Sequence, residues 1–200
     1  MAIKVANNQS LTAITALPSA VSGGAMTLLE TKTASSSATV TFDSDIDDTY
    51  DEYVFKFYNI HPATNATQLQ VNFRDGSTAY DATKTSTAFN SQHKEDGSGG
   101  SLGYETGTDI AQGTGFMDIS VGAGYGNDEC LDGTLHLYDP SNTTFVKHFM
   151  SDVTFGYNTW LMTTRVSGYC NVTAAIDGVQ FKMSSDEIDS GVINGNQSSQ

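Results

Sequence analysis

Residues 51–73 read DEYVFKFYNIHPATNATQLQVNF, and their alternation of apolar and polar positions predicts two β-strands joined by a turn. The large apolar residues of each segment share one parity: Tyr53, Phe55 and Phe57 in the first, and Leu69, Val71 and Phe73 in the second. The intervening residues 61–66 (HPATNA) contain proline and asparagine, which favour turns. A half-buried hairpin of this kind needs a second sheet to cover its apolar face, so the segment predicts a β-sandwich.

The rest of the chain repeats this pattern. Short alternating segments bounded by turn residues occur at 26–31, 38–42, 133–138, 144–155, 160–172 and 178–184, with shorter ones at 86–89, 101–104 and 115–121. Residues 133–138 and 144–155, joined by the turn sequence DPSN, predict a second hairpin. The chain of 200 residues is long enough for one domain of this type. We therefore expect an all-β protein, an antiparallel β-sandwich of jelly-roll or lectin-like type with about eight strands.

The pattern divides the chain into three parts. Residues 1–26 show no clean period of 2 or 3.6 and are expected to form an extended N-terminal arm that is ordered when another protein covers it. Residues 27–190 are expected to form the sandwich, and residues 191–200, rich in glycine, asparagine and glutamine, a flexible tail. The aliphatic residues of the arm are candidate docking residues: Ile3, Val5, Leu11, Ile14 and Leu17.

The formal net charge of −14 argues against nucleic acid as a partner, because the nine basic residues form no stripe that could bind phosphates. No apolar run approaches the roughly 20 residues that a membrane span needs, so no membrane insertion is expected. The first residues lack the basic head and apolar core of a secretory signal. We therefore expect the protein to be made in the cytoplasm.

No residue set predicts catalysis, a metal site or a cofactor. Cys130 and Cys170 can form at most one disulfide, and reduced thiols are expected in the cytoplasm. Residues 43–48 (DSDIDD) resemble the start of a calcium loop, but Asp48 stands at the position that needs glycine and Val54 where glutamate is required. An acidic turn is the better interpretation. With 23 acidic residues the sequence cannot select a glycosidase pair, and no other nucleophile or base motif occurs.

Aromatic residues outside the predicted core are candidate binding residues. Tyr104, Tyr125, Tyr157 and Trp160 have the ring surface to stack on sugars, and they fit equally a role as core or subunit-interface anchors. His136 and His148 lie inside predicted strands and are expected to point to solvent or to a neighbouring strand. The long loops of residues 75–128 are where a specific binding site would be expected.

Longer segments carry a resemblance to a known family. The segments ITALPSAVSGGAMTLLETKTASSSATVTF, DDTYDEYVFKFYNIHPATN, GNDECLDGTLHLYDPSNTTFVKHF and AAIDGVQFKMSSDEIDSG resemble β-rich virion proteins of tailed phages that infect marine bacteria, of the cyanophage and pelagiphage type. These relatives are described as tail-fibre-like structural proteins. The chain departs from them at residues 190–196 (SGVINGN), where relatives have a strand resembling GTIKLYG, so only Val192 and Ile193 are expected to remain as a strand remnant.

The resemblance implies a non-enzymatic structural protein of the virion. It implies a tail-fibre or appendage protein that contacts the host surface, with a host glycan as ligand, other virion proteins as partners and a homotrimeric assembly. A capsid decoration protein is the alternative, and a glycan-degrading enzyme of the tail is a third.

Overall fold

The computed structural model describes residues 26–198. This part of the chain consists of strands joined by turns and loops and contains no helix. In chain order the strands are β1 (Thr27–Ser37), β2 (Val40–Phe42), β3 (Glu52–Pro62), β4 (Leu69–Arg74), β5 (Lys84–Lys94), β6 (Gly100–Tyr104), β7 (Met117–Asp118), β8 (Leu131–Tyr138), β9 (Lys147–Tyr157), β10 (Trp160–Cys170), β11 (Gly178–Met183) and β12 (Ile188–Ser198). The predicted all-β class is confirmed.

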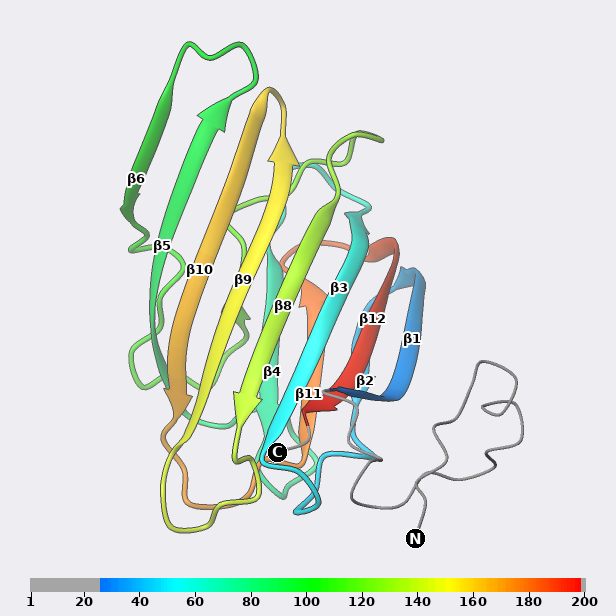
Figure 1. Ribbon diagram of the computed structural model, residues 1–200, viewed down its shortest axis with the longest axis vertical. Helices are drawn as coiled ribbons and strands as arrows, with labels where there is room; N and C mark the ends of the chain where they lie inside the picture. Colours follow the sequence, from blue (N-terminus) through cyan, green and yellow to red (C-terminus); the bar gives the residue numbers. More distant parts are fainter. Residues whose placement is uncertain (1–25, 199–200) are drawn as a thin grey trace, which may run out of the picture.

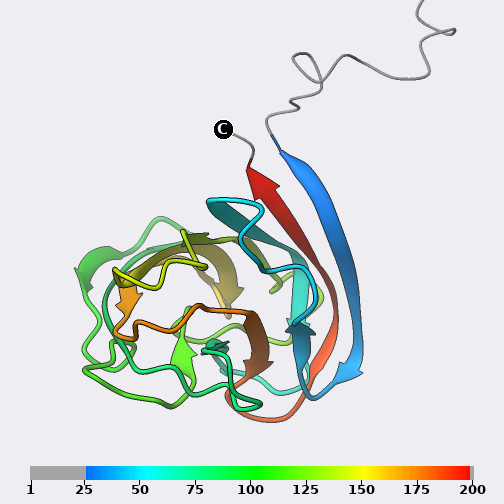
Figure 2. The ribbon, with the colours of Figure 1, turned by 90° about the horizontal axis from the view of Figure 1, so that it is seen from below.

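The strands form two antiparallel sheets that pack face to face (Figure 1). The larger sheet has the order β1-β12-β3-β8-β9-β10-β5-β6, and the smaller sheet has the order β2-β11-β4-β7. Seen from below, the larger sheet curves around the smaller one (Figure 2). We call the face of the larger sheet that packs on the smaller sheet its inner face, and the opposite face its outer face. The predicted antiparallel β-sandwich is confirmed.

The chain connects the two sheets in the manner of a jelly roll. Strands β1, β3, β8 and β12 lie side by side in the larger sheet, and their partners β2, β4, β7 and β11 make up the smaller one. The chain passes from one sheet to the other at nearly every connection between these strands. Two hairpins, β5–β6 and β9–β10, are inserted into this pattern and widen the larger sheet.

The structure corrects the prediction of a hairpin at residues 51–73. Its two strands exist as β3 and β4, but β3 pairs with β12 and β8, whereas β4 pairs with β11 and β7. The turn residues 63–68 therefore carry the chain across the sandwich rather than back along one sheet. The second predicted hairpin is confirmed, because β8 and β9 pair directly.

The structure also corrects the expected flexible tail at residues 191–200. Residues 191–198 form most of β12, which lies between β1 and β3 inside the larger sheet. Ile188 and Ile193 are both buried although they have opposite parity, because the register with β3 shifts around Gly191. Gly191 has φ +130°, and a Cβ there would lie 2.8 Å from the Asn59 carbonyl oxygen, so glycine is needed at this bulge.

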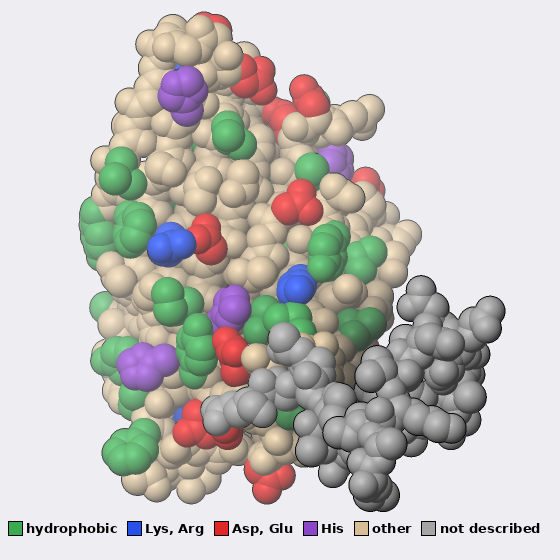
Figure 3. Space-filling view, viewed as in Figure 1, with side chains coloured by type: hydrophobic (Ala, Val, Ile, Leu, Met, Phe, Trp, Pro, Cys, Tyr) green, Lys and Arg blue, Asp and Glu red, His purple; other side chains and the backbone are tan. Residues whose placement is uncertain are grey.

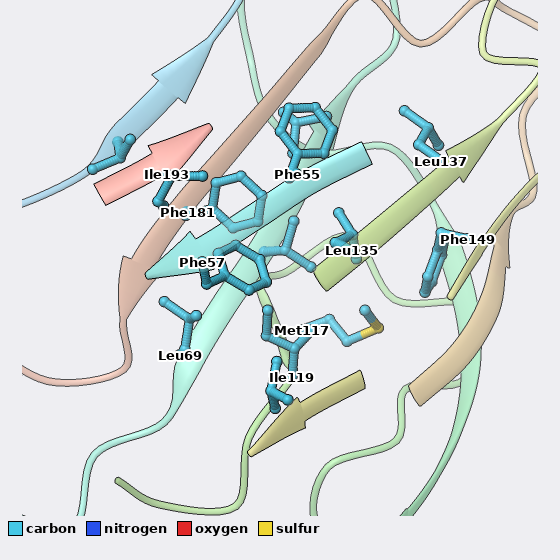
Figure 4. Packing of buried hydrophobic residues seen from close by; sticks show 14 of the residues in the cluster. Phe55, Phe57, Leu69, Met117, Ile119, Leu135, Leu137, Phe149, Phe181 and Ile193 are labelled. Atoms are coloured by element: carbon cyan, nitrogen blue, oxygen red, sulfur yellow. The ribbon is translucent and has the colours of Figure 1, made fainter. Parts of the chain in front are cut away.

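The core fills the space between the inner face and the smaller sheet (Figure 4). Phe181 of β11 lies at its centre, with its ring edge-to-face against Phe55 and Phe57 of β3 at centroid distances of 5.5 and 5.2 Å. Phe73 of β4 stacks on Phe149 of β9 at 5.1 Å. These contacts between rings of the two sheets hold the layers in register.

Two lysines are buried on the inner face, which is unusual for this residue type. Lys84 of β5 donates hydrogen bonds from Nζ to Asn72 Oδ1 at 2.6 Å and to the Ala82 carbonyl at 3.1 Å. Lys147 of β9 donates to two carbonyls of the 171–177 loop, those of Val172 and Ala174, each at 2.6 Å. Both lysines stand opposite Cys170 in the register of β10, so they flank a buried thiol.

Residues 26–198 include no helix long and apolar enough to cross a membrane.

Candidate functional site

A shallow open groove of about 460 Å³ hollows the outer face of the larger sheet (Figure 3 shows this face). It lies where β8 and β10 end and where β5 and β9 begin. Its lining comprises Thr85, Ser86, Thr87, Tyr138, His148, Phe149, Met150, Ser167, Gly168 and Tyr169. We call this feature the outer-face groove.

The strand alternation explains why the surface is hollowed here. Outward positions of β5 and β10 carry the small side chains of Thr85, Thr87 and Ser167, which form the floor. Larger side chains stand beside them, with Met150 directly opposite Ser167 and Tyr169 directly opposite Thr85. A groove results because small and large side chains stand next to each other on this face of the sheet.

Aromatic and imidazole rings lie in the groove and directly beside it. His148 of β9 and Tyr169 of β10 face each other across the ladder, with ring centroids 5.9 Å apart. His136 and Tyr138 project from the same face of β8 and stack, with centroids 6.1 Å apart and an interplanar angle of 21°. Four rings from three adjacent strands therefore form one surface, which we call the ring cluster.

Neighbouring polar groups fix the ring cluster. Glu52 Oε1 lies 2.8 Å from His136 Nδ1 and holds this ring in place from the adjacent strand β3. Burial raises the pKa of the Tyr138 hydroxyl, and the nearby Glu52 carboxylate adds to this effect. Tyr138 therefore remains protonated at neutral pH, with a hydroxyl hydrogen to donate.

A second hollow of about 240 Å³ continues the groove along β8 to β10 and shares Tyr138 and Met150 with it. Its polar side chains include Asp152 and Arg165, which face each other across β9 and β10. Arg165 Nε donates to Asp152 Oδ2 at 3.1 Å, and a second guanidinium nitrogen bonds the same oxygen. The two hollows together present apolar rings next to a fixed donor and acceptor pair.

This arrangement suits a sugar better than a reactive substrate. A pyranose ring has an apolar C–H face that packs on an aromatic ring, and its hydroxyls bond to carboxylate, guanidinium, imidazole and phenol groups. An open, shallow groove binds a chain-like ligand along its length, whereas a small molecule usually needs an enclosed pocket.

The structure separates the aromatic residues that the sequence suggested for binding. Tyr157 and Trp160 lie opposite each other next to the β9–β10 turn, and Lys94 Nζ lies 5.0 Å from the Trp160 ring. Tyr104 is exposed on β6, and Tyr125 is exposed in the loop before β8. None of these four residues lines the outer-face groove.

The residues of the ring cluster were visible in the sequence but were not selected as a site. His136 and Tyr138 alternate with Leu135 and Leu137, so the sequence does place them on the outward face of β8. What the sequence does not give is the neighbour order β8-β9-β10-β5, which brings Tyr169 to the same place. The candidate docking residues Ile3, Val5, Leu11, Ile14 and Leu17 lie outside the described residues.

Burial or hydrogen bonding accounts for the remaining candidate groups, which are the two cysteines and two aspartates. Both cysteines are free, and burial raises the pKa of Cys130 and raises that of Cys170 to about 12, so neither is an activated nucleophile. In the acidic turn, Asp47 Oδ1 accepts hydrogen bonds from the Thr49 N–H at 2.8 Å and the Tyr53 hydroxyl at 3.1 Å. Asp118, whose pKa burial raises, bonds Gln70 on the smaller sheet and is remote from the groove.

Within residues 26–198, no group of three or more histidine, cysteine, aspartate or glutamate side chains is placed to hold a metal ion.

Comparison with known proteins assigns no family. No family model matches the chain, and no curated protein matches it. A solved structure with some similarity is a structural-genomics protein of unknown function from Bacteroides ovatus, with 7% sequence identity and a TM-score of 0.28. The match covers 52% of this chain and 45% of the other, so the chain spans less than half the length of that protein. A likeness of this size carries no argument about function.

Proposed function

We propose that this protein is a non-enzymatic structural protein of a tailed-phage particle, a tail-fibre or appendage component that contacts a glycan on the host surface. The virion setting rests on the sequence resemblance. The glycan contact rests on the ring cluster of His136, Tyr138, His148 and Tyr169, whose rings line the outer-face groove and the hollow that continues it along β8. This cluster is the observation that carries the proposal.

The position of the groove supports a surface-binding role. It lies on strands whose inner side chains are packed in the core, so the ring positions are held rigidly before a ligand arrives. Tyrosine and histidine rings have few rotatable bonds, and they therefore lose little conformational entropy on binding. The polar pair of Asp152 and Arg165 adds direction to the contact.

Binding to host polysaccharide tests the proposal. We expect the purified protein to bind polysaccharide extracted from a susceptible host and to compete with phage adsorption. Tyr169→Ala should weaken binding by roughly twofold to tenfold, because one stacking contact is worth about 0.5–1.5 kcal/mol. The matched control is Tyr125→Ala, which removes an exposed tyrosine outside the groove and should leave binding unchanged.

Two outcomes contradict parts of the proposal. If saturating protein neither binds the polysaccharide nor delays adsorption, the glycan contact is wrong. If density maps of purified particles place many copies over the capsid shell, the protein is a decoration protein and the appendage assignment is wrong. Loss of polysaccharide on incubation with protein alone would instead indicate an enzyme.

A further inference from the structure

The two outer edges of the larger sheet differ in how they are protected from pairing with another strand. In the described part of the chain, β1 forms one edge and β6 forms the other (Figure 1). β1 carries charged residues, with Lys32 Nζ 2.5 Å from Glu30 Oε1, and a register shift between Leu28 and Glu30. Charges and bulges on an edge discourage pairing with a second chain.

β6 has none of these protective features. Its sequence, GSLGY, contains no charged residue and no proline, and its pairing with β5 is regular over all five residues. Leu102 is 74% exposed and Tyr104 is 56% exposed. Phe89, directly opposite Tyr104 on β5, is 42% exposed and extends the same apolar surface.

The hydrogen bonds of the hairpin show which backbone groups of β6 face outward. The Lys94 N–H donates to the Gly99 carbonyl and the Glu105 N–H donates to the Ala88 carbonyl, each at 2.9 Å. In an antiparallel ladder such bonded positions recur at every second residue, so the odd-numbered residues 99–105 turn their backbone groups toward β5. The N–H and C=O groups of Gly100, Leu102 and Tyr104 therefore face away from the sheet.

We propose that β6 is a pairing site for a second copy of this chain, with the two β6 strands antiparallel about a twofold axis at Leu102. In this register the outward-facing backbone groups of Gly100, Leu102 and Tyr104 meet the same groups of the partner strand. The N–H and the C=O of each of these three residues thus both gain a hydrogen-bond partner on the other strand.

The side chains of β6 are complementary in size to themselves in this register. Leu102 meets its own copy at the axis, and Tyr104 lies over the partner's Gly100, which leaves room for the ring. On the inner face, Ser101 lies beside the partner's Gly103. The Tyr104 hydroxyl bonds the Asp109 carboxylate, so the ring is already held in place before the strands meet.

The self-complementary side chains of β6 make a second copy of this chain the occupant. Although the chain carries a formal net charge of −14, the uncharged β6 strand places no like charges in direct contact where two copies meet. One pair of short strands covers less than the roughly 1,200 Å² of a stable interface, so we expect a weak dimer that dissociates on dilution. Many copies held on one particle would raise the effective concentration and favour the pairing.

Sedimentation velocity from about 1 μM to about 500 μM tests the pairing. We expect a concentration-dependent dimer in the full chain. Leu102→Lys places two positive charges together at the axis and should abolish the dimer. The matched control is Leu28→Lys on β1, a leucine that is 53% exposed at the other edge, and it should leave the dimer unchanged.

A second variant separates backbone pairing from side-chain effects. In Leu102→Pro, proline removes only an N–H that faces away from β5, so the β5–β6 ladder remains intact. We expect an unchanged β circular-dichroism spectrum and loss of the dimer. A protein that stays monomeric over the whole range, a dimer that survives both Leu102 variants, or a trimer as the associated species would each overturn the proposal.

Cross-linking checks the register. Cα atoms of a bonded antiparallel pair lie about 5.5 Å apart, so Leu102→Cys in a Cys130→Ser background should give a covalent dimer with a short bismaleimide. Leu28→Cys in the same background should not. Equal cross-linking at both positions would contradict the proposed axis.

Discussion

The two faces of β8, β9 and β10 have different surroundings although they are made from the same strands. Inward residues such as Leu135, Leu137 and Phe149 are fully buried against the smaller sheet. The residues between them, such as Tyr138 and His148, line the outer-face groove. Successive side chains of a strand point to opposite faces, so one face can be tuned for binding while the other keeps the core.

With the glycan contact that we propose, stability and recognition are separable at neighbouring positions of the chain. Truncating a side chain on the inner face leaves a cavity between two packed sheets. Truncating a side chain on the outer face leaves no cavity, because the space is already open to solvent.

The largest effect is expected for Phe149→Ala on the inner face. Phe149 stacks on Phe73 of the opposite sheet, and its loss should lower the free energy of unfolding by about 3–5 kcal/mol. Chemical denaturation measures this change. The control is Phe145→Ala, a phenylalanine 70% exposed in the preceding loop, for which a change within about 0.5 kcal/mol is expected. Similar losses for both variants would contradict the assignment of Phe149 to the core.

An intermediate effect is expected from pH, because ionisable groups lie on the inner face. Burial lowers the pKa of Lys84 from 10.5 to about 8, so above pH 8 the unfolded chain binds more protons than the folded protein. The free energy of unfolding should therefore rise with pH, by up to about 1.4 kcal/mol per unit. Burial raises the pKa of Cys170 from 9.0 to about 12, which gives the opposite slope above pH 9. We expect a rise between pH 8 and 9, followed by a plateau.

The plateau should end in a fall above about pH 10.5, where the contribution of Lys84 is complete. Burial also raises the pKa of the Tyr53 hydroxyl from 10.0 to about 12, which adds to the fall. Denaturation curves at successive pH values measure the profile. Lys84→Met should reduce the rise and leave the fall. The remaining rise comes from Lys147, whose pKa burial also lowers. A profile that is the same in Lys84→Met and the unaltered protein would show that Lys84 does not cause the rise.

The smallest effect on stability is expected for Tyr169→Ala on the outer face. This variant should change the free energy of unfolding by less than about 0.5 kcal/mol while it weakens polysaccharide binding. Thermal unfolding and binding measured on one preparation make the comparison direct. A large loss of stability would mean that the ring cluster supports the sheet, and the two faces would then not be separable.

The sequence predicted the layers of this protein better than their connections. Alternation located most strands and the β8–β9 hairpin, because period 2 depends only on which face is buried. The same alternation occurs whether the chain turns back within a sheet or crosses to the opposite sheet. The alternation therefore could not predict that β3 and β4 pair with strands of different sheets.

Strand β12 was missed for a different reason. Its apolar residues Ile188 and Ile193 fit no single alternation, because the bulge at Gly191 lies between them. Much of its remaining stability comes from backbone pairing on both sides and from polar contacts, such as Asn196 Nδ2 to the Val54 carbonyl at 3.2 Å. Neither of these contributions appears in a hydrophobicity pattern.

The candidate site was only partly predictable. Sequence parity places His136, Tyr138, His148 and Tyr169 on outward faces, but their meeting depends on which strands are neighbours. The burial of Lys84 and Lys147 could not be predicted from the sequence. A buried lysine is stable only when hydrogen-bond acceptors surround it, and here these acceptors come from other segments of the chain.

The place of β12 between β1 and β3 has a consequence for synthesis on the ribosome. Thr27 of β1 pairs with Gln197 of β12, which is synthesised about 170 residues later. At usual translation rates, β1 is therefore made on the order of 10–30 seconds before its partner strand. During that interval β1 has no partner in the larger sheet, and β3 lacks one of its two. The nascent chain therefore exposes unpaired strands until β12 has been synthesised, and it is at this stage that a chaperone would be of most use.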